Sequence, residues 1–449
     1  MSRLESETHR HPNRADTAVD HLAKPKLWDG KFQKPLAPGR FPPISTPSVK
    51  VPKLVYWAFM LFAFSLPFEA AELLFAQRGA LTLARVAGFG LVASCFLYPT
   101  RCLPHPHRAL WWMLVYFMIC LLHSLIIPTQ YIDALRGNLI FMAQFFIIFW
   151  IIAGLFKDEK CARVILLTFS IAATLMALGA LLGIPGFSSA MMERNTVRLT
   201  VAEEVNPNYT AYITGLAAVI LVGFLLNNSP QSLWHKVSLT VLTVPLFVVT
   251  VATGSRTGMA GLLLGLSVYA LPLGRSRRKL TTLIWGTFAI AMVVYLSLTN
   301  PVSSSRWDIT YASKDNARIE IWSLAVGVIA DRPIFGWGPI MNEAEIGRRE
   351  GRRNRSPHNF LLSLFSAGGL IGGSAFLVGF GLCIREAWRA RAGNLGLLPL
   401  ALTITLTLNN LTQPWLFRRP TWFVLGLLVA AVSFCPRGKY IIRIIRRRR

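Results

Sequence analysis

The sequence Ser356-Pro-His-Asn359 stands at the boundary that decides the fold of this chain. It closes a polar segment, residues 299–357, which carries nine basic and seven acidic side chains. An almost purely apolar run, residues 360–383, begins directly after it. A run of about 18 or more apolar residues is long enough to cross the hydrocarbon core of a bilayer as a helix. The boundary therefore predicts that His358 lies at a membrane surface, beside a charged loop.

Similar apolar runs recur along the chain, which has 449 residues, 53% of them hydrophobic. We predict an all-α membrane protein with about twelve transmembrane helices, because a helix satisfies its own backbone polar groups in lipid. The predicted spans are residues 54–73, 82–98, 109–127, 138–156, 163–184, 209–226, 237–253, 257–273, 280–298, 359–383, 395–412 and 421–435.

The distribution of positive charge predicts the orientation of these spans. The formal net charge is +26, and lysine and arginine gather in the cytoplasmic loops of membrane proteins. An N-terminus in the cytoplasm puts 30 of the 47 basic residues on that side. We therefore interpret the charge as a topology signal and predict no nucleic acid partner.

This topology divides the chain into three parts. Residues 1–53 are predicted to form a disordered basic cytoplasmic tail, and residues 54–435 a polytopic transmembrane domain. Residues 436–449 form a second basic cytoplasmic tail, which is expected to attract anionic lipid head groups. Two loops on the outer side, residues 185–208 and 299–357, are long enough to hold structure.

Local patterns predict short elements in these outer loops. Residues 317–330 place apolar side chains at helical spacing, which predicts an amphipathic helix with Arg318 in its first turn. Pro333 ends that helix, and Gly336-Trp-Gly338 predicts a turn. Asn206-Pro-Asn208 is expected to cap the helix that follows it.

Arginines are the first candidates for chemistry, because a guanidinium group binds phosphate oxygens through a two-pronged fork. Arg256 lies in Thr253-Gly-Ser-Arg-Thr-Gly258, where two glycines allow a phosphate to approach closely; an arginine snorkelling at a helix end is the alternative. Arg318 is either a phosphate ligand or a solvated charge, and Arg198 is equally open. The remaining candidates for substrate binding form a cluster, for which a solvated loop is the alternative: Arg348, Arg349, Arg352, Arg353 and Arg355.

His358 is the one histidine that this topology puts outside, and histidine acts as a general base near neutral pH. Asn359 beside it is a candidate for substrate binding. Glu320, Glu203 and Glu204 are alternative acid or base groups. Nucleotide-binding and metal-binding motifs are missing from the outer loops, so we expect no cofactor and no metal. These residues fit a reaction on an already activated, phosphorylated substrate.

Several motifs occur in a fixed order: Asn206-Pro-Asn-Tyr209, Gly254-Ser-Arg-Thr-Gly258, Arg318-Ile-Glu-Ile-Trp322, Pro333-Ile-Phe-Gly-Trp-Gly338, Pro357-His-Asn-Phe-Leu361 and Gly368-Gly-Leu370. Together, over residues 54–435, they resemble the O-antigen ligase and Wzy polymerase superfamily of the bacterial envelope. The resemblance implies a GT-C-like glycosyltransferase of the cell inner membrane with a periplasmic active site. Its donor would be a glycan linked to undecaprenyl diphosphate.

In this family, ligases pass the glycan to lipid A–core in lipopolysaccharide biosynthesis, and polymerases pass it to another repeat of O-antigen or exopolysaccharide. The resemblance implies that Arg256 and Arg318 bind the diphosphate and that His358 lies near the acceptor or leaving group. We expect a ligase, with a polymerase as the alternative. The loop between Arg318 and His358 is compact for this family, which leaves the acceptor open. A transporter or flippase of lipid-linked glycan or a small anion is the alternative from another class, and it would be expected to carry charge within its spans.

Overall fold

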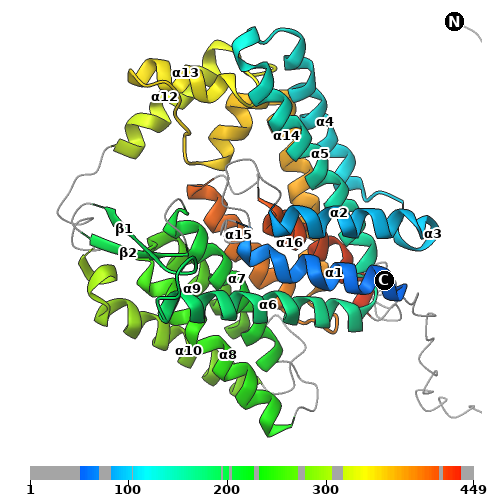
Figure 1. The fold of residues 1–449 in the computed structure, drawn as a ribbon, viewed down its shortest axis with the longest axis vertical. Helices are drawn as coiled ribbons and strands as arrows, with labels where there is room; N and C mark the ends of the chain where they lie inside the picture. The colour runs from blue at the N-terminus through cyan, green and yellow to red at the C-terminus, as the bar shows by residue number, and fades with distance from the viewer. Residues whose placement is uncertain are drawn as a thin grey trace, which may run out of the picture. The chain divides into compact units, whose positions relative to one another are not determined.

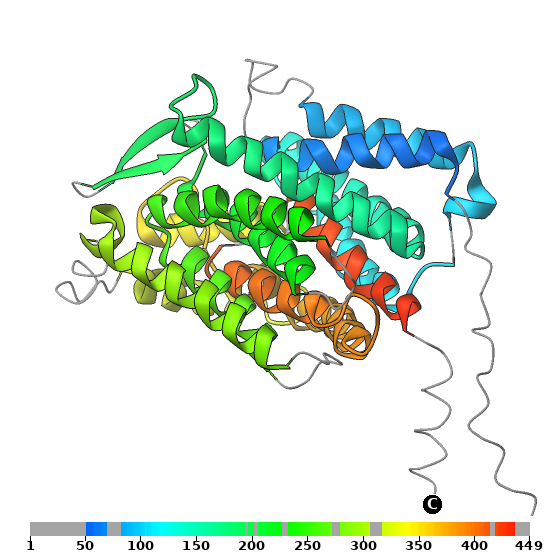
Figure 2. The same ribbon diagram turned by 90° about the horizontal axis from the view of Figure 1, so that it is seen from below.

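The computed structural model describes residues 51–69, 82–103, 105–193, 196–201, 205–226, 232–271, 279–305, 317–413 and 418–435, which are mainly helical (Figures 1 and 2). The first elements, including short 3-10 helices (η), are α1 (Lys53–Ser65), η1 (Leu66–Phe68), α2 (Leu83–Phe96), α3 (Pro99–Cys102), α4 (Arg108–Leu122), η2 (His123–Leu125), η3 (Thr129–Tyr131), α5 (Ile132–Leu155), α6 (Glu159–Leu181), β1 (Ser189–Glu193), β2 (Thr196–Thr200) and α7 (Pro207–Leu225). The later elements are α8 (Leu233–Ala252), α9 (Arg256–Ala270), α10 (Lys279–Thr299), α12 (Ala317–Asp331), α13 (Met341–Glu350), α14 (Phe360–Ala390), α15 (Leu398–Thr412), α16 (Arg419–Ala430) and η5 (Ala431–Phe434).

Every apolar run predicted as a span contains one of these helices. Within the described residues, six helical segments are long and apolar enough to cross a membrane: Arg108–Leu125, Thr129–Leu155, Glu159–Leu181, Pro207–Leu225, Leu233–Ala252 and Phe360–Ala390. Four shorter apolar helices accompany them: Lys53–Phe68, Leu83–Phe96, Gly286–Thr299 and Arg419–Phe434. The protein is thus a helical membrane protein, and the count of twelve spans stays a prediction.

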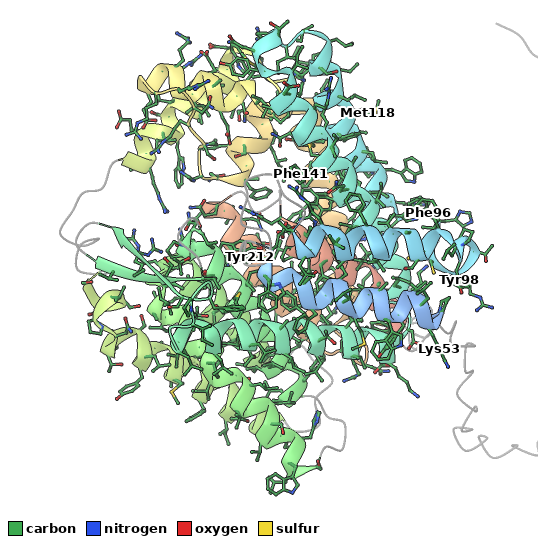
Figure 3. The ribbon with its side chains drawn as sticks, in the orientation of Figure 1. Lys53, Phe96, Tyr98, Met118, Phe141 and Tyr212 are labelled. Carbon is green, nitrogen blue, oxygen red and sulfur yellow. The ribbon has the colours of Figure 1, made fainter. Side chains whose placement is uncertain are left out.

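Apolar side chains cover much of the outer surface of these helices. Phe96 is 60% exposed and Met118 is 50% exposed, although both are large and apolar. Figure 3 shows both side chains directed away from the helices, whereas Tyr212 lies among them. Apolar surface on this scale requires an apolar surrounding, and lipid supplies it for helices of this length.

Helix α7 is the most buried of the candidate spans, with 83% of its apolar window buried. It packs against α6, α8, α9 and α15. The Asn206 side chain caps it as predicted, because Oδ1 accepts a hydrogen bond from the Asn208 N–H at 2.9 Å. Pro207 occupies the first turn, where a missing N–H costs nothing. This cap fixes where α7 begins.

Helices α9 and α15 run antiparallel in close contact. A Cβ atom on Gly261 would clash with Asn409, and one on Gly265 would clash with Thr405. Residues with higher numbers in α9 therefore contact residues with lower numbers in α15. This register brings the start of α9, at Arg256, to the same end of the pair as the last turn of α15.

Helix α14 is kinked at Gly369, whose φ of 60° lies in the left-handed region. The Gly336-Trp-Gly338 turn packs into this kink: the Trp337 N–H donates to the Ser366 carbonyl and the Gly338 N–H to the Ala367 carbonyl, both at 2.9 Å. A side chain on Gly336 or Gly369 would meet backbone atoms of the other segment. The predicted turn is confirmed, and it connects the polar segment to α14.

Strands β1 and β2 pair antiparallel as a hairpin, in the register Ser189 opposite Thr200 and Met191 opposite Arg198. The expectation of an all-α chain did not include it. The buried and exposed positions of β2 are inverted, since Val197 is 50% exposed whereas Arg198 is 3% exposed. The usual alternation of core-facing apolar residues therefore gave no strand signal here.

A buried ion pair joins η1 to α16. Arg419 Nη1 lies 2.7 Å from Glu69 Oε1, and both side chains are almost fully buried. The Tyr209 hydroxyl donates to Glu69 Oε2 at 3.4 Å, which adds the start of α7 to this network. Breaking such a pair by removing one partner costs about 3–5 kcal/mol, because the other charge stays buried. The pair therefore holds the starts of α7 and α16 together.

Candidate functional site

A small apolar cluster, separate from the main core, holds α12, α13 and the start of α14 together (Figure 1). Its buried members are Ile321, Ala325, Val328 and Ile346. Helix α12 begins at Ala317 and ends at Asp331, which confirms the predicted helix with Arg318 in its first turn. This arrangement makes residues 317–350 a folded unit that precedes His358 in the chain.

Trp322 connects α12 to the loop that carries His358. Its indole Nε1–H donates to the Pro357 carbonyl at 3.1 Å. Arg318 lies four residues earlier, so it shares a helix face with Trp322. The Arg318 side chain is exposed. The sequence Arg318-Ile-Glu-Ile-Trp322 therefore presents a guanidinium group and an anchoring indole on the side of α12 that meets His358.

The backbone at His358 adopts a conformation that is rare outside glycine, with a φ of 48°. Its N–H donates to Ser356 Oγ at 3.4 Å. Asn359 follows as the cap of α14, because its Oδ1 accepts from the N–H groups of Leu361 and Leu362. Left-handed backbone at a non-glycine residue costs about 1–3 kcal/mol and gathers at functional sites. The contacts on both sides hold the imidazole in place.

Gln413, at the end of α15, fixes the state of the imidazole. Its Oε1 lies 3.2 Å from His358 Nδ1. An amide oxygen only accepts hydrogen bonds, so Nδ1 carries the proton and Nε2 carries the lone pair. Nε2 is therefore the ring nitrogen of His358 that can accept a proton.

Charge and burial keep this imidazole neutral. Burial lowers the pKa of His358 below its ordinary 6.5, and the hydrogen bond with Gln413 opposes that effect. The cations of Arg355 and Arg318 lower the pKa further. A lowered pKa keeps the lone pair available at neutral pH. The same two cations would attract an anionic substrate.

Arg256 begins α9, directly after the turn at Gly254, whose φ is 60°. The Ser255 hydroxyl caps the helix by accepting from the Gly258 N–H at 3.1 Å. Helix N-termini attract anions through unsatisfied N–H groups and the helix dipole. Since α9 and α15 are antiparallel, the Arg256 turn and Gln413 lie at the same end of that pair.

Arg198 supports this turn from β2 and is 3% exposed. Its Nε donates to the Thr253 carbonyl at 2.7 Å, and its Nη2 donates to Asn208 Oδ1 at 2.9 Å. These bonds connect the hairpin, the start of α7 and the turn before Arg256. The burial of the side chain favours a positioning role over direct substrate binding.

The arginines near α13 are mostly paired with carboxylates. Arg348 and Arg349 both bind Glu345, and Arg349 also binds Asp331. Hydrogen bonding from Arg348 is the main cause that lowers the pKa of Glu345 to about 2. Two further ion pairs join Glu350 to Arg352 at 3.7 Å and to Arg355 at 3.1 Å.

Two further predicted residues, Arg353 and Glu320, are not brought into this group. Arg353 is exposed in the loop after α13. Glu320 is exposed on α12, two residues after Arg318. Glu203 and Glu204 lie outside the described residues.

Residues 241–377 match the family model described as O-Antigen ligase. That match includes Arg256, Arg318 and His358. This part of the chain is therefore similar to the O-antigen ligase family. The chain is also 25% identical over 252 residues to a curated protein of Pseudomonas aeruginosa PAO1 named O-antigen ligase. The alignment covers 55% of this chain and 54% of that protein, so the chain spans about half the length of this relative.

The sequence analysis did not single out three polar residues whose contacts the structure shows: Gln413, Arg418 and Glu343. Gln413 follows two buried asparagines in an apolar run, and that polar interruption was the available signal. Arg418 lies over the Tyr209 ring, with its Cζ 5.1 Å from the ring centroid. Burial raises the pKa of Glu343, and a hydrogen bond with Ser356 opposes that effect.

His123 lies within the candidate span Arg108–Leu125, as the sequence analysis expected. It begins η2, directly after α4, and its Nε2 lies 3.2 Å from the Gly336 carbonyl oxygen. The polar segment therefore meets a second, buried histidine.

Proposed function

We propose that this protein is a membrane glycosyltransferase that takes a glycan from undecaprenyl diphosphate and transfers it to lipid A–core. The observation that carries the proposal is the surroundings of His358. Its Nδ1–H faces an amide oxygen at 3.2 Å, and the cations of Arg318 and Arg355 lower its pKa. A neutral base beside fixed cations suits transfer from a diphosphate to a hydroxyl group.

The proposed step is a single displacement at the anomeric carbon. His358 Nε2 takes the proton of the acceptor hydroxyl as its oxygen bonds to that carbon. The bond to the diphosphate oxygen breaks, and the electron pair leaves with undecaprenyl diphosphate. Arg318 and Arg256 stabilise the negative charge that develops there, which is the role a metal ion fills in other enzymes. We therefore propose a metal-independent reaction.

One observation supports a periplasmic position for this site and cytoplasmic termini. Lys157, Arg385 and Arg389 gather around one pocket at the far end of α14 from His358. Basic residues mark the cytoplasmic side of membrane proteins. In this orientation the inner-membrane protein presents His358 to lipid-linked substrates in the outer leaflet, and residues 1–53 and 436–449 are its cytoplasmic tails.

Transfer to lipid A–core is favoured over polymerisation because the curated relative is named O-antigen ligase. The alternative is a Wzy-type polymerase of O-antigen or exopolysaccharide, which would use the same donor. Transport of lipid-linked glycan needs neither an oriented base nor a fixed tautomer, so the hydrogen bond between Gln413 and His358 favours a transferase.

The test replaces the chromosomal gene with His358→Ala and separates lipopolysaccharide on a gel, while glycan on the lipid carrier is measured in parallel. A ligase leaves core-only lipopolysaccharide and long polymer on the carrier. Core with a single repeat and no long polymer would assign polymerisation instead. Unchanged glycans, with variant protein present in the membrane, would overturn the proposal. Arg348→Ala is the matched control, because that arginine is exposed and paired with Glu345.

A further inference from the structure

A pocket of about 450 Å³ lies at the other end of α14 from His358. Four segments line it: the start of α4, the end of α5, the end of α14 and the last turns after α16. The residues that line it include none of the candidate active-site residues, and α14 changes direction at Gly369 between His358 and the pocket. It is therefore a second site, which the proposed transfer reaction does not use.

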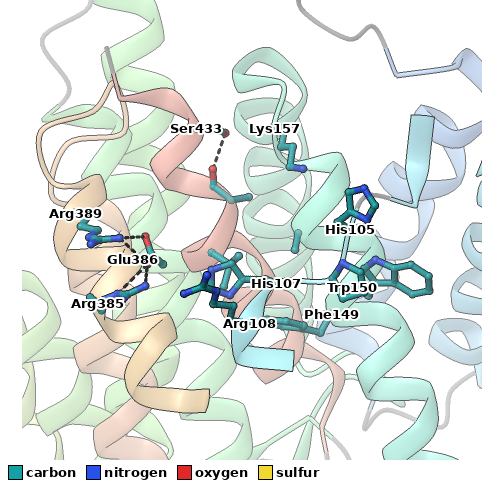
Figure 4. Close-up of a pocket in the computed structure, with 14 residues that line it drawn as sticks. His105, His107, Arg108, Phe149, Trp150, Lys157, Arg385, Glu386, Arg389 and Ser433 are labelled. Atoms are coloured by element: carbon teal, nitrogen blue, oxygen red, sulfur yellow. Dashed lines mark hydrogen bonds and ion pairs between the residues drawn. The ribbon is translucent and has the colours of Figure 1, made fainter. Parts of the chain in front are cut away.

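The pocket has an unbalanced positive charge. Its permanent cations are Arg108, Lys157, Arg385 and Arg389, and its one carboxylate is Glu386. Figure 4 shows Arg385, Glu386 and Arg389 on one side, His105 and Trp150 on the other, and His107 with Arg108 between them.

Glu386 is only 5% exposed and is already occupied. It accepts hydrogen bonds from Arg385 Nη2 at 2.7 Å and from Arg389 Nη1 at 3.1 Å. One carboxylate balances one of these two arginines. Arg108 and Lys157 are exposed and face the same pocket. The pocket thus keeps about three uncompensated positive charges.

His107 lies close to these cations and offers a hydrogen-bond donor. Burial lowers the pKa of His107, Glu386 opposes that effect, and the cations of Arg385, Arg108 and Lys157 lower the pKa further. The His107 Nδ1 accepts a hydrogen bond from the Ala109 N–H at 3.1 Å. Nδ1 therefore carries the lone pair, and Nε2 carries a proton that can be donated.

The rest of the wall is apolar. Phe149, Trp150 and Ala153 from α5 and Val429 and Ala430 from α16 face the same space. These helices are apolar enough to lie in a membrane. A group that fills this pocket therefore has anionic oxygens at one end and apolar carbon beside them.

We propose that this pocket binds a phosphate group, and that the head group of an anionic phospholipid supplies it. Arg108, Lys157, Arg385 and Arg389 neutralise the phosphate, and the aromatic wall accommodates the adjoining glycerol and upper acyl carbons. Basic pockets between membrane helices on the cytoplasmic side bind such head groups. The bound lipid would hold the ends of α4, α5 and α14 together against the mutual repulsion of their cations.

The test uses the purified full chain in detergent, with phosphatidylglycerol as the probe. Native mass spectrometry measures retained lipid, and the melting temperature is measured as lipid is added. The test variant is Arg108→Gln with Lys157→Gln. The matched control is Arg101→Gln with Lys160→Gln, which removes the same charge from exposed side chains outside the pocket.

We expect the test variant to retain at least about tenfold less phosphatidylglycerol than the wild type and the control. Added lipid should raise the melting temperature of the wild type and the control but not of the test variant. Equal retention in both double variants would overturn the proposal. The single exposed substitution Lys157→Glu serves as a second variant if the double variant does not fold, and it must also lose the lipid.

Inorganic phosphate and phosphatidylcholine separate the sources of the phosphate. Millimolar phosphate that stabilises the protein through Arg108 and Lys157, with no effect of phosphatidylglycerol, would overturn the lipid source. Equal retention of zwitterionic phosphatidylcholine would overturn recognition of net negative charge. Preference for phosphatidylglycerol over both supports the proposal.

Discussion

The arginines of α13 and the arginine at the start of α12 have opposite surroundings. Arg348 and Arg349 bind Glu345, one turn earlier on the same helix. Arg318 instead lies on the face of α12 that carries Trp322, whose indole N–H donates a hydrogen bond to the Pro357 carbonyl. The charge of Arg318 lowers the pKa of His358. The difference teaches that the density of arginine in a sequence is a poor guide to a phosphate site. The charges that act on the candidate base come from Arg355, in the loop after α13, and from Arg318, which lies outside the cluster.

The largest effect is expected from the base itself. His358→Ala removes the lone pair that Gln413 orients, so transfer should fall by about 10²- to 10⁴-fold. Release of undecaprenyl diphosphate by the purified protein measures this rate. His358→Gln is the control for volume and hydrogen bonding, and it should be equally inactive. A variant that keeps most of its rate would remove His358 from the chemistry.

The next effect concerns the arginine at the start of α9. Arg256→Ala removes a cation that we propose stabilises the leaving diphosphate, and transfer should fall by about 10²- to 10³-fold. Arg256→Lys should recover only part of the rate, because an ammonium group has no planar fork. The rate constant at saturating donor checks this. Full activity of Arg256→Ala would favour the alternative, in which the arginine only extends its charge from a helix end to the membrane surface.

A smaller effect should appear in the pH dependence. Arg318→Gln removes a cation that lowers the pKa of His358, so that pKa should rise. A base is active when deprotonated, so activity falls as the pH drops through its pKa. The acid limb of the rate profile should therefore move to higher pH in Arg318→Gln. An unmoved limb, or one shifted to lower pH, would contradict the effect of the Arg318 charge on His358.

The smallest effect is expected on α13. Arg348 is 71% exposed and paired with Glu345 on its own helix. Exposed pairs of this kind contribute little, so Arg348→Ala should keep transfer within about twofold. The steady-state rate at several donor concentrations measures it. A rise of tenfold or more in the KM for the donor would show that the α13 arginines bind the substrate.

Local patterns predicted much of the fold. Apolar runs predicted the helices because hydrophobic length is a property of the sequence itself. Asn206 as a cap and residues 317–330 as a helix followed from neighbouring residues, and both are confirmed. The hairpin was missed because β2 faces Arg198 inward and Val197 outward.

The missed parts of the site depend on contacts between distant residues. Gln413 meets His358 across 55 positions, and His123 meets Gly336 across 213 positions. No pattern in one segment encodes such a partner. The ion pairs of the α13 arginines could have been predicted from the sequence, because Glu345 lies three residues before Arg348 and four before Arg349. Composition alone made that cluster look like a binding site.

The most direct measurement compares Arg318→Ala with Arg348→Ala in one reconstituted reaction. Each purified variant receives undecaprenyl-diphosphate-linked glycan and lipid A–core, and the first-order rate of glycan transfer is recorded. We predict that Arg318→Ala is slower than Arg348→Ala by about 10²- to 10³-fold, with both variants equally folded. Equal rates, or a greater loss in Arg348→Ala, would contradict the claim that position beside His358 makes an arginine functional.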